Sequence, residues 1–152
     1  MKAITCLLLL ITCFYGDVPK ISVTDAEKVL GQTARMSASS GEEKNGVSKQ
    51  RYTYVAIADT LSHLYYLSAQ YPVITAAQKA YAAIVAGNVG MPGQEKITGL
   101  GDEAFFHTDK QHFYLIIFRK KDQVITLKVN KLTGKTSAPE LRKLAAKLEH
   151  NV

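Results

Sequence analysis

Histidines are the side chains of this sequence best suited to metal chemistry. They stand at His63, His107, His112 and His150. No two of them are four residues apart, the spacing of a helical zinc-binding pair. If residues 108–111 form a hairpin turn, His107 and His112 face each other across two strands, with Asp109 in the loop. Two exposed imidazoles without a third fixed ligand hold a transition metal poorly, so we predict a solvated hairpin tip and no metal centre.

Nucleophiles and paired carboxylates give no recognisable catalytic arrangement. Ser39 and Ser40 have no histidine partner visible in the sequence, and the pairs Glu42/Glu43 and Asp102/Glu103 fall in loops or at strand edges. Residues 99–102 (GLGD) are too short for a dinucleotide fingerprint, so we predict a turn with positive backbone dihedrals. We predict a non-enzymatic protein with no catalytic residues and no cofactor. The alternative is a small secreted hydrolase or metal-binding protein whose site is assembled only in three dimensions.

Basic residues gather in the last third of a chain whose net charge is +6. They are Lys120, Lys121, Lys128, Lys131, Lys135, Arg142, Lys143 and Lys147. Six of these form the predicted anionic-surface site: Lys120, Lys121, Lys128, Arg142, Lys143 and Lys147. Such a surface would bind anionic headgroups or acidic polymers weakly, by screened Coulomb attraction. Nucleic acid is not an expected partner, because no aromatic-basic RNA-binding motif accompanies the charges.

The N-terminus has the pattern of an export signal. Met1 and Lys2 precede an apolar run from Ala3 to Thr12, which is shorter than the roughly 20 residues that span a bilayer. Residues 10–13 (LITC) resemble a bacterial lipobox, which implies a diacylglycerol on Cys13. We therefore expect a signal peptide over residues 1–12, a tether over 13–20 and one domain over 21–152, outside the cytoplasm and anchored to a membrane through Cys13.

The remaining sequence alternates between helical and strand patterns. Capping boxes at Thr24/Glu27, Thr75/Gln78 and Ser137/Glu140 predict helices over 25–30, 76–86 and 138–149. In the last helix Leu141, Leu144, Ala145 and Leu148 form one apolar stripe. Period-two runs predict strands over 33–37, 50–58, 61–70, 103–108, 113–119 and 124–130. Short polar connections favour hairpins. The result is an α+β fold: a curved antiparallel sheet of about five to six strands with two to three helices packed on one face.

Two segments carry a family resemblance. Residues 24–31 (TDAEKVLG) and 97–106 (ITGLGDEAFF), followed by the paired strands 114–118 and 124–129, resemble small bacterial envelope lipoproteins of unknown function, the LpqN-like group, which are similar to the PsbP fold. The resemblance implies an envelope location and an antiparallel sheet with packed helices, and it brings no catalytic residues.

These features together predict an envelope lipoprotein that binds a protein, lipid or glycan partner. A flat aromatic surface built from Tyr52, Tyr54, Tyr65 or Tyr66 would favour this binding role. A deep pocket with converging polar groups would favour the hydrolase or metal-binding alternative.

Overall fold

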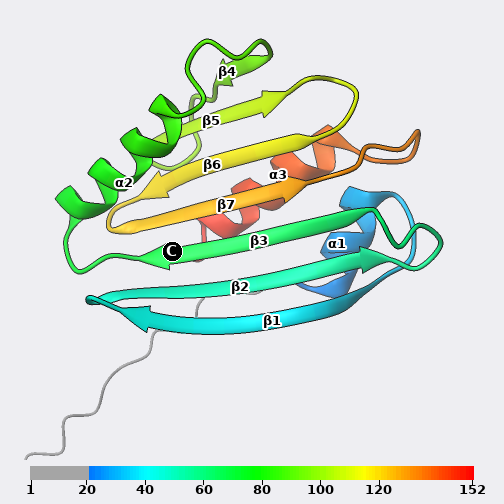
Figure 1. The fold of residues 1–152 in the computed structure, drawn as a ribbon, viewed down its shortest axis with the longest axis horizontal. Coiled ribbons are helices and arrows are strands. Elements are labelled where there is room, and N and C mark those ends of the chain that lie inside the picture. Colours follow the sequence, from blue (N-terminus) through cyan, green and yellow to red (C-terminus); the bar gives the residue numbers. More distant parts are fainter. Residues whose placement is uncertain (1–20) are drawn as a thin grey trace, which may run out of the picture.

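One antiparallel sheet organises residues 21–152, which the computed structural model describes. The helices are α1 (Val23–Leu30), α2 (Ile74–Ala86) and α3 (Ala138–Glu149). The strands are β1 (Ala34–Lys44), β2 (Val47–Ala56), β3 (His63–Gln70), β4 (Gln94–Lys96), β5 (Glu103–Thr108), β6 (Tyr114–Lys120) and β7 (Gln123–Val129). Their spatial order is β1-β2-β3-β7-β6-β5-β4 (Figure 1). The α+β class is confirmed, with seven strands where the sequence predicts five to six.

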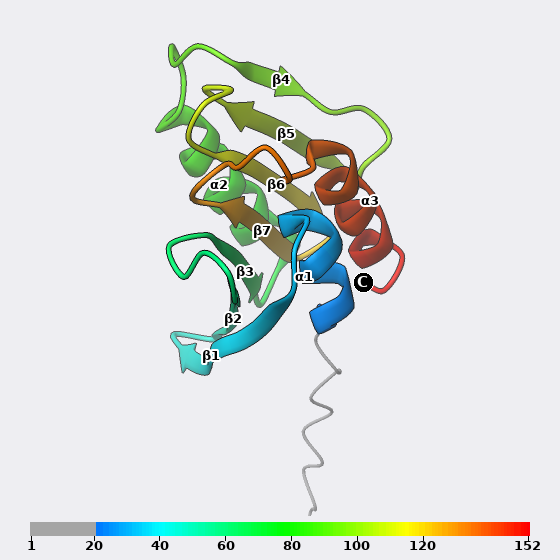
Figure 2. The same cartoon turned by 90° about the vertical axis from the view of Figure 1, so that its right-hand side faces the viewer.

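The helices divide between the two faces of the sheet. Figure 2 shows α1 and α3 on one side of the twisted sheet and α2 on the other. The predicted packing on one face therefore holds for α1 and α3, whereas α2 covers part of the opposite face. This second cover explains why β6 is apolar on both faces: Ile116 and Phe118 pack toward α1 and α3, while Ile117 packs in the cluster of α2.

The main core lies between the sheet and the pair α1 and α3. The predicted stripe of α3 is buried in it: Leu141, Leu144, Ala145 and Leu148 are at most 4% exposed. From β7, Ile125, Leu127 and Val129 point into the same core, as their alternation with Thr126 and Lys128 predicts.

Two helix starts differ from their predictions. α1 begins two residues earlier than Thr24 implies, because Ser22 is the N-cap and forms a capping box with Asp25. Glu27 instead accepts a hydrogen bond from the backbone N–H of Ala34 at 3.2 Å. α2 follows Val73, which offers no side-chain cap. The third start is as predicted, since the hydroxyl of Ser137 accepts from the N–H of Glu140 at 3.3 Å.

The segment 99–102 forms the predicted turn before β5. Gly99 and Gly101 have φ values of 78° and 58°, a region in which a side chain is strained. A Cβ atom on Gly101 would also collide with the carbonyl oxygen of Arg119. The turn therefore packs tightly on β6, and this contact fixes the position of Asp102 and Glu103.

Candidate functional site

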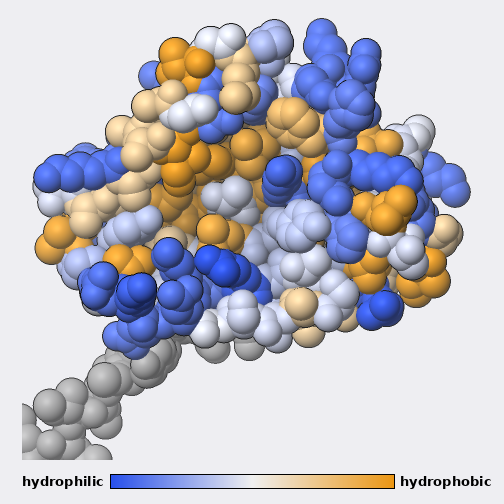
Figure 3. All heavy atoms as spheres, viewed as in Figure 1, coloured by the Kyte–Doolittle hydropathy of each residue, from blue (hydrophilic) through white to orange (hydrophobic). Residues whose placement is uncertain are grey.

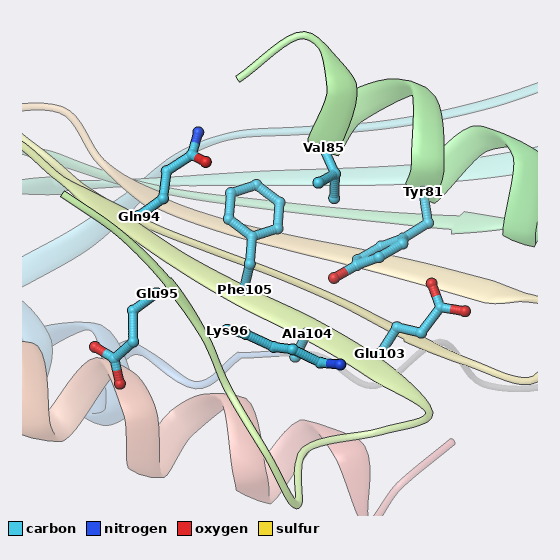
Figure 4. Close-up of a pocket in the computed structure, with 8 residues that line it drawn as sticks. All are labelled: Tyr81, Val85, Gln94, Glu95, Lys96, Glu103, Ala104 and Phe105. Atoms are coloured by element: carbon cyan, nitrogen blue, oxygen red, sulfur yellow. The ribbon is translucent and has the colours of Figure 1, made fainter. Parts of the chain in front are cut away.

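A groove opens between α2 and the β4–β5 edge of the sheet. Its volume is about 480 Å³. It is lined by Tyr81 and Val85 of α2, by Gln94, Glu95 and Lys96 of β4, and by Glu103, Ala104 and Phe105 of β5 (Figure 4). Because β4 has only three residues, this edge of the sheet is short and leaves the groove open beside the helix.

Aromatic and aliphatic side chains form the interior of the groove. The rings of Tyr81 and Phe105 meet edge to face, with centroids 6.3 Å apart and planes inclined by 67°. Val85 stands one turn further along α2, above the Phe105 ring (Figure 4). Ala77 of α2 is fully buried on the side of the helix that faces the sheet, and its small side chain lets α2 approach the sheet. The helix therefore packs Tyr81 and Val85 directly against the buried ring of Phe105.

The hydroxyl of Tyr81 is the polar group inside this apolar lining. It points toward Phe105 and the interior of the groove (Figure 4). Burial raises the pKa of Tyr81 to about 12, and the nearby negative charge of Glu103 adds to the rise while Arg119 opposes it. The phenol is therefore protonated at neutral pH and available as a hydrogen-bond donor.

Charged groups stand at the rim. Glu103 accepts a hydrogen bond from Nη2 of Arg119 at 3.2 Å, and Arg119 Nη1 also bonds the backbone carbonyl of Lys121 at 2.8 Å. Glu95 turns toward α3, where its carboxylate accepts from Arg142 at 2.8 Å. Lys96 is exposed and forms no ion pair within residues 21–152. The rim thus offers one unpaired ammonium and one carboxylate held by a buried arginine.

The chemistry of this lining suits ligand binding. An apolar cavity of several hundred cubic ångströms with a few placed polar groups is the usual form of a small-molecule site. The eight lining residues include no serine, cysteine or histidine, so the described part of the groove pairs no such nucleophile with a base.

The two metal candidates are not brought together. His107 lies on β5 opposite Leu115 and is 4% exposed, and its Nε2 is 3.2 Å from the carbonyl oxygen of Pro92. His112 lies in the loop before β6 and is exposed, with Nδ1 2.5 Å from the carboxylate of Asp109. The predicted facing pair is therefore wrong, because the loop is longer than residues 108–111. Within residues 21–152 there is no group of three or more His, Cys, Asp or Glu that could hold a metal ion.

The six predicted basic residues do not share one surface. Four of them form ion pairs: Lys120 with Glu149, Arg142 with Glu95, Lys143 with Glu140, and Lys147 with Asp25. Arg142 also stacks over Phe106, 4.4 Å from the ring centroid. Lys121 occupies the β6–β7 turn, and Lys128 lies on the sheet face opposite α3. Much of the charge of this third of the chain is therefore neutralised locally.

The four tyrosines do not make a flat aromatic surface. Tyr54 and Tyr66 are buried beneath α1 and α3, and Tyr52 stacks on Tyr66 with ring centroids 5.8 Å apart. Tyr65 alone points to the opposite face, where it is 38% exposed. Cys13, the predicted lipid site, lies outside the described residues, as do the predicted signal and tether.

Sequence reasoning placed Tyr81 and Val85 on the apolar side of a helix and missed the groove that they line. The only signal was indirect: residues 80–89 carry no charge. A helix with one buried face usually has charged residues on its other face, so this uncharged stretch is longer than one buried face requires. No protein-family model matches the chain, and no curated protein matches it. The site is therefore defined by its geometry alone.

Proposed function

We propose that this chain is an exported, lipid-anchored envelope protein whose role is binding, and that the groove between α2 and the β4–β5 edge takes the ligand. The groove is the observation that carries the binding role. Its apolar interior suits an alkyl chain or an aromatic ring. The protonated hydroxyl of Tyr81 suits a hydrogen-bond acceptor on that ligand, such as a carbonyl or ether oxygen.

The proposed location outside the cytoplasm and the proposed membrane anchor rest on the N-terminal sequence. An apolar run followed by the lipobox-like residues 10–13 supports acylation of Cys13. Ile21 is 4% exposed, so the packed domain begins soon after that cysteine and residues 14–20 would serve as a short tether. The helices described in residues 21–152 include none that is long and apolar enough to cross a membrane, and the lipid would supply the attachment.

The proposal places the chain among the small bacterial envelope lipoproteins that it resembles. The second resembling segment, residues 97–106, contains Glu103, Ala104 and Phe105 of the groove lining. A ligand bound there would contact the segment that carries the resemblance. Proteins of this group could then share a binding site at this edge of the sheet.

The groove can be tested with N-phenyl-1-naphthylamine, a neutral apolar dye whose fluorescence rises on binding. The protein would be the lipid-free mature chain, residues 13–152 with Cys13→Ser. Val85→Trp fills the groove and should weaken dye binding at least about tenfold, because the indole occupies the space above Phe105. Val89→Trp is the matched control, since Val89 is 71% exposed and outside the lining.

Tyr81→Phe separates the hydroxyl from the apolar contacts. It should leave binding of this dye within about twofold and weaken an analogue with a carbonyl oxygen more strongly. Equal dye binding by wild type and Val85→Trp would contradict the groove as the ligand site.

A further inference from the structure

Part of the sheet face that carries α2 is left open. The helix lies over β6 and β7, and the neighbouring strands β3, β2 and β1 extend beyond it (Figure 1). Figure 3 looks onto this face: hydrophobic residues gather over α2, and hydrophilic residues gather toward the ends of β1 and β2. The open area is therefore distinct from the groove, which lies at the β4 edge on the far side of α2.

The register of the strands defines which side chains share this open area. Tyr65 of β3 lies between Thr53 of β2 and Lys128 of β7. In the next row, Leu67 lies between Arg51 and Thr126. Directly opposed residues on one face are about 5 Å apart and diagonal neighbours about 7–8 Å apart. Tyr65 is thus a direct neighbour of Lys128 and a diagonal neighbour of Arg51.

Two cations of this area make no ion pair among the described residues, although Glu42 of β1 lines the same small pocket as Arg51. Arg51 and Lys128 are exposed, and neither forms an ion pair with any residue that the structure describes. A third cation, Lys49, precedes Arg51 on the same face and has Glu42 opposite it on β1. On α3, by contrast, Arg142, Lys143 and Lys147 all have carboxylate partners. Of these six cations, those without an ion pair lie on the sheet, and the three on α3 are paired.

The composition of the area matches a chain of acidic sugars. An arginine and a lysine about 12 Å apart, by the strand spacing and the rise per residue, can pair with separate carboxylates. The exposed ring of Tyr65 between them is an apolar surface with a polar end. The hydroxyls of Thr53 and Thr126 can donate to or accept from sugar hydroxyls.

The shape of the face favours a chain over a bilayer. A helix packed on a sheet raises the surface by about 10 Å, so α2 forms a wall beside the floor of β7, β3 and β2. A flat membrane would rest on that wall and leave Lys128 and Tyr65 out of contact. Single-stranded nucleic acid would need several stacking rings, whereas Tyr65 is the one aromatic among the exposed large hydrophobic residues of the described chain.

We propose that the open face of β2, β3 and β7 binds an acidic polysaccharide, with Arg51 and Lys128 pairing to its carboxylates and Tyr65 contacting a sugar ring. This site is separate from the groove, and Val85→Trp should not affect it. It moves the anionic-binding surface from the C-terminal helix to the sheet.

The test uses the full-length chain in a neutral detergent and fluorescein-labelled alginate oligomers, which are polyuronates, followed by fluorescence anisotropy. Arg51→Glu with Lys128→Glu should weaken binding at least tenfold and flatten its dependence on salt, because two carboxylate contacts are lost. Lys143→Glu with Lys147→Glu makes the same change of charge on α3 and should have less than a twofold effect. Arg51→Gln with Lys128→Gln, a milder change, should weaken binding in the same direction.

Three competitors distinguish the ligand class. Neutral dextran should not displace the probe, and thymidine oligonucleotides or micelles containing phosphatidylglycerol should displace it only at much higher concentrations of anionic groups than unlabelled alginate. The proposal is overturned if alginate does not bind at low salt, or if the α3 variant weakens binding as much as the sheet variant. It is also overturned if the oligonucleotide or the anionic lipid competes better than alginate.

Discussion

Nη1 of Arg119 donates a hydrogen bond to the carboxylate of Asp102 at 2.7 Å, and only 5% of the Arg119 side chain is exposed. The same carboxylate accepts from the backbone N–H of Lys121 at 2.8 Å. Asp102 therefore joins the turn before β5 to the β6–β7 turn and compensates a buried guanidinium. Because Arg119 also holds Glu103 at the rim of the groove, this contact connects the stability of the sheet to the shape of the site.

Asp102→Ala should lower the free energy of unfolding by about 1–3 kcal/mol, because it removes a charged hydrogen bond from a buried arginine and another from a backbone amide. Chemical denaturation of wild type and variant measures the difference. Asp122→Ala, in the adjacent turn, is the control, since its side chain accepts no hydrogen bond among those found in residues 21–152. Equal losses in the two variants would contradict the role given to Asp102.

Acid should destabilise the fold through carboxyl groups whose pKa is lowered, among them Asp102 and Asp25. The N–H of Lys121, together with the charge of Arg119, lowers the pKa of Asp102. Burial would raise the pKa of Asp25, but the hydrogen bonds from Lys147 and Ser22 outweigh it and the pKa is lowered. Both groups bind protons more readily in the unfolded chain. Their contribution is complete above about pH 5 and is lost as the pH falls through about 4 toward the lowered values.

Denaturation midpoints between pH 6 and pH 2 measure this loss. Asp102→Asn should show a shallower decline than wild type, because one of the carboxyl groups with a lowered pKa is gone. A decline of unchanged steepness would show that Asp102 does not contribute to the linkage.

How much of this molecule could be predicted depends on how local its determinants are. The stripe of α3 and the alternation of β7 were correct because each is set by the period of one element. The start of α1 is ambiguous in the sequence, because Ser22 with Asp25 and Thr24 with Glu27 offer similar caps two residues apart. The carboxylate of Glu27 instead accepts a hydrogen bond from the backbone N–H of Ala34, so it is not used to cap the helix.

The groove lay beyond such reasoning. β4 is three exposed residues without a pattern, and the side of the sheet chosen by α2 depends on contacts between distant segments. The pairing of His107 with Leu115 likewise depends on the length of the loop that follows β5. The polar residues of this segment predict a loop but do not determine how long it is. The open face of β2, β3 and β7 could not be predicted either, because the sequence does not show that the basic residues of α3 form ion pairs.

Leu144→Ala should cost about 2–5 kcal/mol, since the side chain is 4% exposed and its removal leaves a cavity under α3. Leu61→Ala makes the same change where the side chain is 67% exposed, and it should stay within about 0.5 kcal/mol of wild type. Urea denaturation compares the two. An unchanged midpoint for Leu144→Ala would mean that α3 does not depend on this core contact.

Cys13→Ser should prevent acylation, because the thiol is the group that would receive the diacylglycerol. In a bacterial host the variant should accumulate as an uncleaved precursor or appear in the soluble fraction, whereas the wild-type chain should sediment with membranes and take up labelled fatty acid. Cys6→Ser is the matched control: it changes the other cysteine of the chain, which lies inside the apolar run that precedes Cys13, and it should leave both labelling and membrane association intact. Intact mass would locate the mature N-terminus. An unlipidated mature protein that begins elsewhere than residue 13, or equal labelling of the Cys13→Ser chain, would refute the proposed anchor while leaving the binding of ligands by the groove open to its own test.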